Sequence, residues 1–323
     1  MIRYQDMDPS VTQDSLHPHA VFHEELVLAR HFTEHATQPG GLDPCPVSGQ
    51  VRYEIFFEKW GRAYAFCPQT WSLALASLPS RADLQDYFHT SDLSRLRCTT
   101  AYQTQLTARR HQLWRHLADW VEGRVQRYLR KDAVDLIDWG SKASGWSEML
   151  GRAGWVRRLS VVDPLPPVQE RDDGGDADLV CLFDVIQRSA EPACLLGEVA
   201  RRMRPGGLLL ASCRSGTGFD VLTLGGASNS IFPFDHVCLP SPEGMRGLLQ
   251  QSGLELLELT TPGMLDIQLV RAAEQELPRD RYFQRYLLEH GGPEMDERFQ
   301  LFLQQNNLSS HLRVVARKPR EAA

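Results

Sequence analysis

The run ADLVCLFDVIQRSAEPACLLGEVARRMRPGGLLL, residues 177–210, decides the fold of this chain. It begins with an almost unbroken apolar segment, ADLVCLFD, which predicts a buried strand. ACLLGEVARRM then predicts a helix, and GGLLLASC, residues 206–213, predicts a second strand. Between these two, RPGG at 204–207 has the residues of a tight turn. A strand, a helix and a strand in this order predict a parallel sheet that is covered by helices.

The same alternation continues on both sides of this run. Strands are predicted at AVDLIDW, RLSVVD and LELLELT, and helices at SEMLGRAG and EGMRGLLQQSG. HLRVVARK, residues 311–318, predicts a further strand at the edge of the sheet. We therefore predict an α/β fold with a doubly wound, mostly parallel sheet. A small N-terminal β module, in which residues 51–66 form two strands joined near Lys59–Gly61, and a helical C-terminal tail accompany it.

Changes in composition divide the chain into five expected parts. They are an N-terminal arm (1–41), a β module (42–100), a linking helix (101–130), the α/β domain (131–270) and a helical C-terminal extension (271–323).

The composition excludes several classes of protein. The chain is 42% hydrophobic and 24% charged, as ordinary globular proteins are. Its net charge of −6 provides no basic face for nucleic acid or for an anionic membrane surface. The N-terminal MIRYQDMDPS lacks the apolar centre of a signal peptide. Seven scattered cysteines, an odd number, predict reduced thiols in a cytoplasm. We expect a cytoplasmic protein that binds neither nucleic acid nor membrane.

Three acidic residues stand where predicted strands end: Asp138, Asp163 and Asp184. Ligands of parallel α/β sheets lie beyond the carboxyl ends of the strands. An acidic residue after the second strand, such as Asp163, can accept hydrogen bonds from both ribose hydroxyls of a nucleoside. A turn or helix-capping aspartate is the alternative at the same position.

These segments together resemble a class I S-adenosylmethionine-dependent methyltransferase with the Rossmann-like fold of that family. The resemblance covers roughly residues 130–270 and includes LIDWGSKASGW, VVDP, the run that starts at ADLV, and FDHVCLPSPEGMRGLLQQSGLEL. It implies that Asp138 and Gly140 open the cofactor loop, that Asp163 holds the ribose and that Phe183 lies near the methionine part of the cofactor. It also implies that Asp184 lies near the acceptor, and that Asp235 and His236 belong to a loop that closes over it.

The cofactor loop departs from the family pattern D-x-G-x-G-x-G. Asp138 and Gly140 match, but Lys142 and Ser144 stand where the later glycines are expected. The stem of Lys142 could fill the pocket, or the side chain could turn outward, or its ammonium could meet the cofactor carboxylate. Whether S-adenosylmethionine still binds therefore stays open.

The acceptor side departs as well. The family commonly has Glu-His where this chain has Gln187-Arg188, and a guanidinium cannot serve as a base at neutral pH. Arg188 could instead bind a phosphate or carboxylate of the acceptor. Arg214 ends the fifth strand on the same rim, beside Cys213, for which a buried inert thiol is favoured. We assign His236 and Asp184 as candidate bases, and Arg188, Arg214 and Asp235 as acceptor-binding residues.

The N-terminal β module resembles the zinc-ribbon-like module that precedes some of these methyltransferases. Each Cys-Pro knuckle keeps its first cysteine, Cys45 or Cys67, but has Ser48 or Thr70 in place of the second. Hydroxyls are poor zinc ligands at neutral pH, and no spacing supports His31, His35 or His89 as substitutes. We expect that no zinc binds, and we assign no metal ligand.

Two functions remain open from the sequence. The first is S-adenosylmethionine-dependent methyl transfer to a small-molecule or sugar-linked acceptor, such as a glycan precursor. The second is a methyltransferase-fold protein that has lost its cofactor and acts as a scaffold or regulatory partner, or runs a different reaction. A protein partner or a homo-oligomer is compatible with either.

Overall fold

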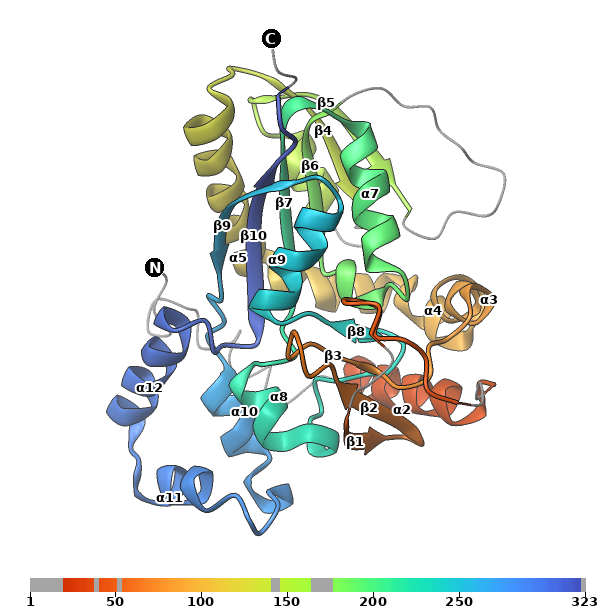
Figure 1. Cartoon of the computed structure of the whole chain (residues 1–323), viewed down its shortest axis with the longest axis vertical. Coiled ribbons are helices and arrows are strands. Elements are labelled where there is room, and N and C mark those ends of the chain that lie inside the picture. The colour runs from red at the N-terminus through yellow and green to blue at the C-terminus, as the bar shows by residue number, and fades with distance from the viewer. Residues whose placement is uncertain (1–19, 38–40, 51–53, 141–145, 164–176, 321–323) are drawn as a thin grey trace.

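The computed structural model describes residues 20–37, 41–50, 54–140, 146–163 and 177–320 (Figure 1). Lys142 and Ser144, on which the sequence left cofactor binding open, lie outside these described residues.

A six-stranded sheet forms the centre of the molecule, in the order β5-β4-β6-β7-β10-β9. The first four strands in this order run parallel, and β10 pairs antiparallel with both β7 and β9. The prediction of an α/β fold with a mostly parallel sheet is confirmed. The strands are β4 (Val134–Trp139), β5 (Val156–Val162), β6 (Ala177–Phe183), β7 (Met203–Arg214), β9 (Glu255–Thr260) and β10 (His311–Arg317).

Helices cover both faces of this sheet, which explains why its central strands are apolar throughout. Successive side chains of a strand point to opposite faces. Accordingly, Leu179 of β6 packs with residues from α5 and α6 on one face, and Val180 packs with residues from α7 and α9 on the other. The helices are α5 (Thr100–Arg124), continued by the π-helical turn η3 (Val125–Leu129), α6 (Trp146–Gly151), α7 (Pro192–Arg202) and α9 (Pro242–Gln251).

The prediction that residues 311–318 form an edge strand is wrong. β10 lies between β7 and β9, and β9 is the edge strand. The reason is in the side chains of β10: Leu312 and Val314 are fully buried on one face of the sheet, and Val315 is fully buried on the other. A strand that is apolar on both faces belongs in the interior of a sheet.

The RPGG segment is also placed differently from the prediction. It lies inside β7, where the pairing with β6 jumps from Ala177↔Met203 to Leu179↔Leu208, and so forms a bulge. Gly206 has a φ of 80° and donates its N–H to the carbonyl of Lys318 at 2.8 Å. The bulge therefore connects β7 to the chain that leaves β10.

A second, four-stranded sheet has the order β1-β2-β3-β8. The hairpin near Lys59–Gly61 is confirmed, since Trp60 and Gly61 form its turn with φ of 50° and 74°. The fourth strand, β8 (Cys238–Leu239), was not expected. It belongs to the segment after His236, far along the chain from the other three strands. The other strands are β1 (Glu54–Lys59), β2 (Arg62–Phe66) and β3 (Leu73–Leu75).

Short helices complete the molecule around the two sheets (Figure 1). Within the N-terminal part, Phe22 and Ala29 of α2 are buried, so this helix packs firmly. The remaining helices are α2 (Ala20–His35), α3 (Arg81–Gln85), η2 (Asp86–Thr90), α4 (Asp92–Arg97), η4 (Ile186–Arg188), α8 (Phe219–Leu224), η5 (Gly225–Ala227), α10 (Asp266–Ala272), η6 (Glu274–Glu276), α11 (Tyr282–His290) and α12 (Pro293–Gln305). Within the described ranges, none of the helices is both long and apolar enough to cross a bilayer.

Gly218 fixes the close approach of α8 to the start of β10. A Cβ at Gly218 would lie 2.3 Å from the Cα of Ser310. We therefore expect Gly218→Ala to lower the free energy of unfolding by roughly 1–3 kcal/mol. Gly247 in α9 is the matched control, because a Cβ there meets no atom within 4 Å. Gly247→Ala should raise stability by about 0.5–1 kcal/mol. Urea unfolding of both variants checks this, and equal effects would contradict the assigned packing.

Candidate functional site

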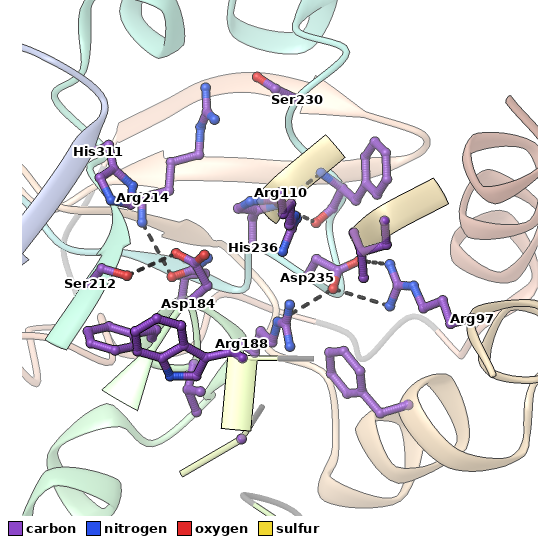
Figure 2. A pocket seen from close by; sticks show the side chains of 18 of the residues that line it. Arg97, Arg110, Asp184, Arg188, Ser212, Arg214, Ser230, Asp235, His236 and His311 are labelled. Carbon is purple, nitrogen blue, oxygen red and sulfur yellow. Dashed lines mark hydrogen bonds and ion pairs between the residues drawn. The ribbon is translucent and has the colours of Figure 1, made fainter. Parts of the chain in front are cut away.

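A cavity of about 2420 Å³ lies at the carboxyl ends of the parallel strands. Its walls come from α5, α6, the strand ends, the segment 224–236 and the first residues of β10. Figure 2 shows that its polar side chains gather around Asp184, with His311, Arg214 and Ser212 on one side and Arg188, Asp235 and Arg97 on the other. Sites for one drug-sized ligand measure roughly 300–1,000 Å³. The cavity therefore has room for two ligands side by side.

One end of the cavity contains the residues that the resemblance assigned to a cofactor. Gly140 has a φ of 100°, which only glycine adopts readily, and its N–H donates to the carbonyl of Val162 at 2.8 Å. Asp163 follows β5 with its side chain 20% exposed, and His89 Nε2 lies 3.7 Å from its Oδ2. Gly140, Asp163 and Phe183 all line the cavity. Asp138 lies beneath them and is fully buried.

Asp184 stands at the centre of the site in a strained conformation. Its φ is 56°, although it is not a glycine, and such residues are frequent at functional sites. Its N–H donates to the carbonyl of Ser212 at 2.9 Å, and the Ser212 hydroxyl donates to its Oδ1 at 3.4 Å. Burial by itself would raise the pKa of Asp184, but nearby His311, Arg110 and Arg188 bring the net shift downward. Asp184 is therefore a carboxylate at neutral pH.

His236 is a neutral imidazole in this cavity. Burial, with help from Arg214, lowers its pKa to about 4, and Asp235 only partly opposes this. Nδ1 lies 3.1 Å from the backbone nitrogen of Phe232 and 3.2 Å from its carbonyl oxygen, so one ring nitrogen is engaged by the backbone. The side chain can donate or accept one hydrogen bond through Nε2, but it is a weak base.

Asp235 belongs to an ionic cluster with the N-terminal helices. It accepts hydrogen bonds from the Tyr87 hydroxyl and from Arg97, both at 2.7 Å. Burial opposes ionisation of Asp235, but Arg97 and Arg188 lower its pKa below the usual range. Arg188 Nε lies 3.6 Å from Oδ1, and the guanidinium of Arg188 lies 5.4 Å from the Phe88 ring centroid. The charge of the Asp235 carboxylate is thus balanced mainly by Arg97. Arg188 lies farther from this carboxylate and lines the cavity.

Arg214 is ion-paired with the fully buried Asp220 and still lines the cavity. Its neighbour Cys213 is buried, and burial raises the pKa of the thiol far above its ordinary value. The thiol is therefore inert at neutral pH.

Several polar side chains of the cavity were given no role in the sequence, among them Arg110 of α5, and His311 and Arg313 of β10. The signal for the last two was present, because HLRVVARK alternates polar and apolar residues over its first four positions. This pattern alone did not indicate a site. Only the antiparallel direction of β10 shows that its first residues lie at the carboxyl edge of the sheet.

The two Cys-Pro knuckles form tight turns in the N-terminal sheet. Cys45 and Cys67 are buried, and Ser48 Oγ lies 3.0 Å from Cys67 Sγ. Throughout the described residues, no group of three or more His, Cys, Asp and Glu side chains is placed to bind a metal ion.

The buried histidines predict how stability depends on pH. The pKa of His236 and that of His311 are each lowered to about 4, mainly by burial, from an unfolded value of about 6.5. Between these values the unfolded chain takes up protons that the folded chain does not. Stability should therefore fall as the pH decreases from about 6.5 to 4.

Thermal unfolding at pH 7 and pH 5 measures this loss. The fall in Tm between pH 7 and pH 5 should be smaller in His236→Asn than in the wild type. In the control variant His23→Asn, whose histidine is exposed, this fall should equal that of the wild type. A wild-type Tm that is constant over this pH range would contradict the neutral burial of both rings.

Comparisons with known proteins show what the α/β part is similar to. The sequence profile of the family described as methyltransferase domain matches residues 109–259. No curated protein gives a significant sequence match.

Solved structures with a similar backbone include the plantazolicin methyltransferase BpumL in complex with a triazolic desmethylPZN analog and SAH. It is 11% identical, with 74% of this chain and 96% of that chain covered and a TM-score of 0.45. The YcgJ protein from Bacillus subtilis is 16% identical, with 59% and 94% covered and a TM-score of 0.34. The 4+2 cyclase SpnF is 15% identical, with 64% and 80% covered and a TM-score of 0.36. The strand order is that of a Rossmann-like α/β fold, as in methyltransferases, and residues 109–259 are similar to the methyltransferase domain family.

Proposed function

We propose that the protein is an S-adenosylmethionine-dependent methyltransferase that acts on a small-molecule or sugar-linked acceptor. The observation that carries this proposal is the pair formed by Gly140 and Asp163 at one end of the cavity. Gly140 has a backbone that only glycine adopts readily, and Asp163 follows the next strand with a partly exposed carboxylate. A methyltransferase domain needs both features to hold a nucleoside.

The described residues fit the cofactor. Asp163 would accept hydrogen bonds from the ribose hydroxyls, and His89, at 3.7 Å, is close enough to share them. Phe183 packs edge-on against Trp146, with ring centroids 5.4 Å apart, and gives this end an apolar wall.

When bound, S-adenosylmethionine supplies a methyl group from its sulfonium, the sulfur keeps the bonding electron pair, and the acceptor loses a proton. The residues of this chain would align the two ligands and exclude water, which can lower the barrier of a bimolecular step by roughly 7–11 kcal/mol. Asp184 would orient the acceptor by accepting a hydrogen bond from its nucleophilic group. His236 would add one further hydrogen bond through Nε2. Since Asp184 and His236 both have lowered pKa values, they suit an acceptor that needs little help in losing its proton.

A domain that no longer uses the cofactor is the competing function. The observation in its favour is the presence of Lys142 and Ser144 where the family has glycines. In that case the protein would act as a scaffold or regulatory partner, or use the cavity for another reaction. Cofactor binding separates the two functions.

Titration calorimetry with S-adenosylhomocysteine tests the proposed function. We expect a single site, whose occupation at 100-fold the Kd adds roughly 2.7 kcal/mol of stability and several degrees of Tm. Asp163→Ala should abolish the heat, because it removes the acceptor of both ribose hydrogen bonds. Asp119→Ala is the matched control, since Asp119 is exposed on α5 and lies outside the cavity lining. Absence of heat in the wild-type protein at millimolar ligand would favour the competing function.

A further inference from the structure

The acceptor end of the cavity is rich in guanidinium groups. Arg110, Arg188, Arg214 and Arg313 come from four different elements, and all line the cavity together with Asp184. Only two of these four arginines lie within ion-pair distance of a carboxylate among the described residues. Arg214 is paired with Asp220, and Arg188 approaches Asp235 at 3.6 Å. Arg110 and Arg313 form neither an ion pair nor a side-chain hydrogen bond with any residue in the described part of the chain.

Arg313 is the most informative of these residues. Its Nε is buried and has no hydrogen-bond partner among the residues that the structure describes. The guanidinium carbon lies 5.3 Å from the Trp120 ring centroid, so the indole packs against the group. Burial lowers the pKa of Arg313 to about 10, and the side chain is still cationic at neutral pH.

A buried cation without a bonded partner is costly. The other arginines with comparable burial have partners that neutralise them or accept their hydrogen bonds. These are Arg97 with Glu25 and Asp235, Arg62 with backbone carbonyls of α2 and the following residues, Arg124 with Glu258, Arg204 with Asp135 and Asp178, and Arg271 with Asp296. Arg313 has no bonded partner of this kind among the described residues, and it lies in the cavity, where Asp184 supplies an opposing charge.

The register of the sheet places Arg214, Arg313 and two neighbouring polar side chains on one face of the sheet. Arg313 of β10 is directly opposite Ser212 of β7, and His311 is directly opposite Arg214. Directly opposite residues in an antiparallel pair project from the same face of a sheet, and so do residues two positions apart on one strand. Ser212, Arg214, His311 and Arg313 therefore form one polar surface next to Asp184, as Figure 2 shows for the first three.

We propose that the acceptor is an anion, whose carboxylate or phosphate group is bound by Arg313 together with Arg110 and Arg188 beside Asp184. This inference rests on the proposed methyltransferase function, because it identifies the ligand of the acceptor end. An oxyanion would accept hydrogen bonds from the guanidinium of Arg313 and would balance the charge of Arg110. It would also direct the nucleophilic group of the acceptor toward Asp184.

Binding of simple oxyanions in the absence of cofactor tests the proposal. The probes are inorganic phosphate and malonate, each compared with sodium chloride at equal ionic strength, by thermal shift and calorimetry. We expect at least one of them to raise the Tm above the chloride value. The anion that gives the larger increase in Tm shows whether the site prefers a phosphate or a carboxylate. Indistinguishable behaviour of phosphate, malonate and chloride would overturn the proposal.

Variants locate the bound anion. Arg313→Gln should weaken the responding anion roughly tenfold to hundredfold, the effect of losing a charge-assisted hydrogen bond. Arg110→Gln, an exposed change on α5 that leaves packing intact, should also weaken it. Arg246→Gln is the matched control, because Arg246 is exposed on α9 and is not part of the cavity lining. An anion response that is unchanged in Arg313→Gln would overturn the proposal.

Two further measurements test whether Arg313 serves only in packing, and whether the anion occupies the cofactor site instead. If Arg313 is kept for ligand binding, the ligand-free Arg313→Gln protein should be as stable as wild type or more stable. A large fall in its Tm with the anion response intact would assign Arg313 to packing and reject the proposal. The affinity for S-adenosylhomocysteine should be unchanged when the anion saturates its site. Competition between the two would place the anion in the cofactor's carboxylate subsite and also reject the proposal.

The failures of the two proposals differ. Normal binding of S-adenosylhomocysteine without any anion response rejects the anionic acceptor and leaves the methyltransferase function intact. Anion binding at Arg313 in a protein that binds no S-adenosylhomocysteine rejects the methyltransferase function, and with it the assignment of the anion as a methyl acceptor.

Discussion

The insertion of β10 between β7 and β9 is the constraint on which the site depends. Because β10 runs antiparallel to both neighbours, its first residues reach the carboxyl edge of the sheet, where β7 ends. β10 thereby contributes His311 and Arg313 to a cavity whose other walls come from several earlier segments, including α5 and α6. Apolar burial holds this strand in place, since Val314 and Val315 pack on opposite faces of the sheet. The chemistry of the acceptor end is thus tied to the packing of the central sheet.

The opposite wall of the cavity is fixed by the N-terminal sheet. The segment that bears His236 continues into β8, which pairs with β3. The Tyr64 hydroxyl donates to the carbonyl of His236 at 2.8 Å, and Lys59 Nζ donates to the carbonyls of Gly226 and Ser228, each at 2.9 Å. Asp235 adds its ionic cluster with Arg97 and Tyr87. The N-terminal sheet therefore stabilises the cavity wall that bears His236.

Local patterns predicted most of the fold. Apolar runs such as LVCLF and LLLASC mark strands because both faces of the sheet are covered, and the turn at Trp60–Gly61 marks a hairpin. Three features had no local signal. The two residues of β8 are too few to show a period, the antiparallel position of β10 depends on partners far along the chain, and the bulge at Gly206 depends on Lys318.

The residues of the site were likewise predicted only in part from local sequence patterns. Asp163, Asp184 and His236 were expected from their positions at strand ends or from the family resemblance, and the structure brings all three to one cavity. The Asp235 carboxylate next to His236 bonds to Arg97 and Tyr87, and burial lowers the pKa of the imidazole, neither of which its position in the sequence indicated. Arg110 gave no sign of a role in the sequence, and the pattern around Arg313 could not be read as a site without knowing where β10 lies in the sheet.

A crystal structure of the protein grown with S-adenosylhomocysteine and phosphate would test this account most directly. The account predicts the ribose hydroxyls of the ligand on the Asp163 carboxylate and an oxyanion on the guanidinium of Arg313, with Asp184 between them. The contradictory result is a cavity that contains neither ligand, with the side chain of Lys142 lying in the space behind Gly140.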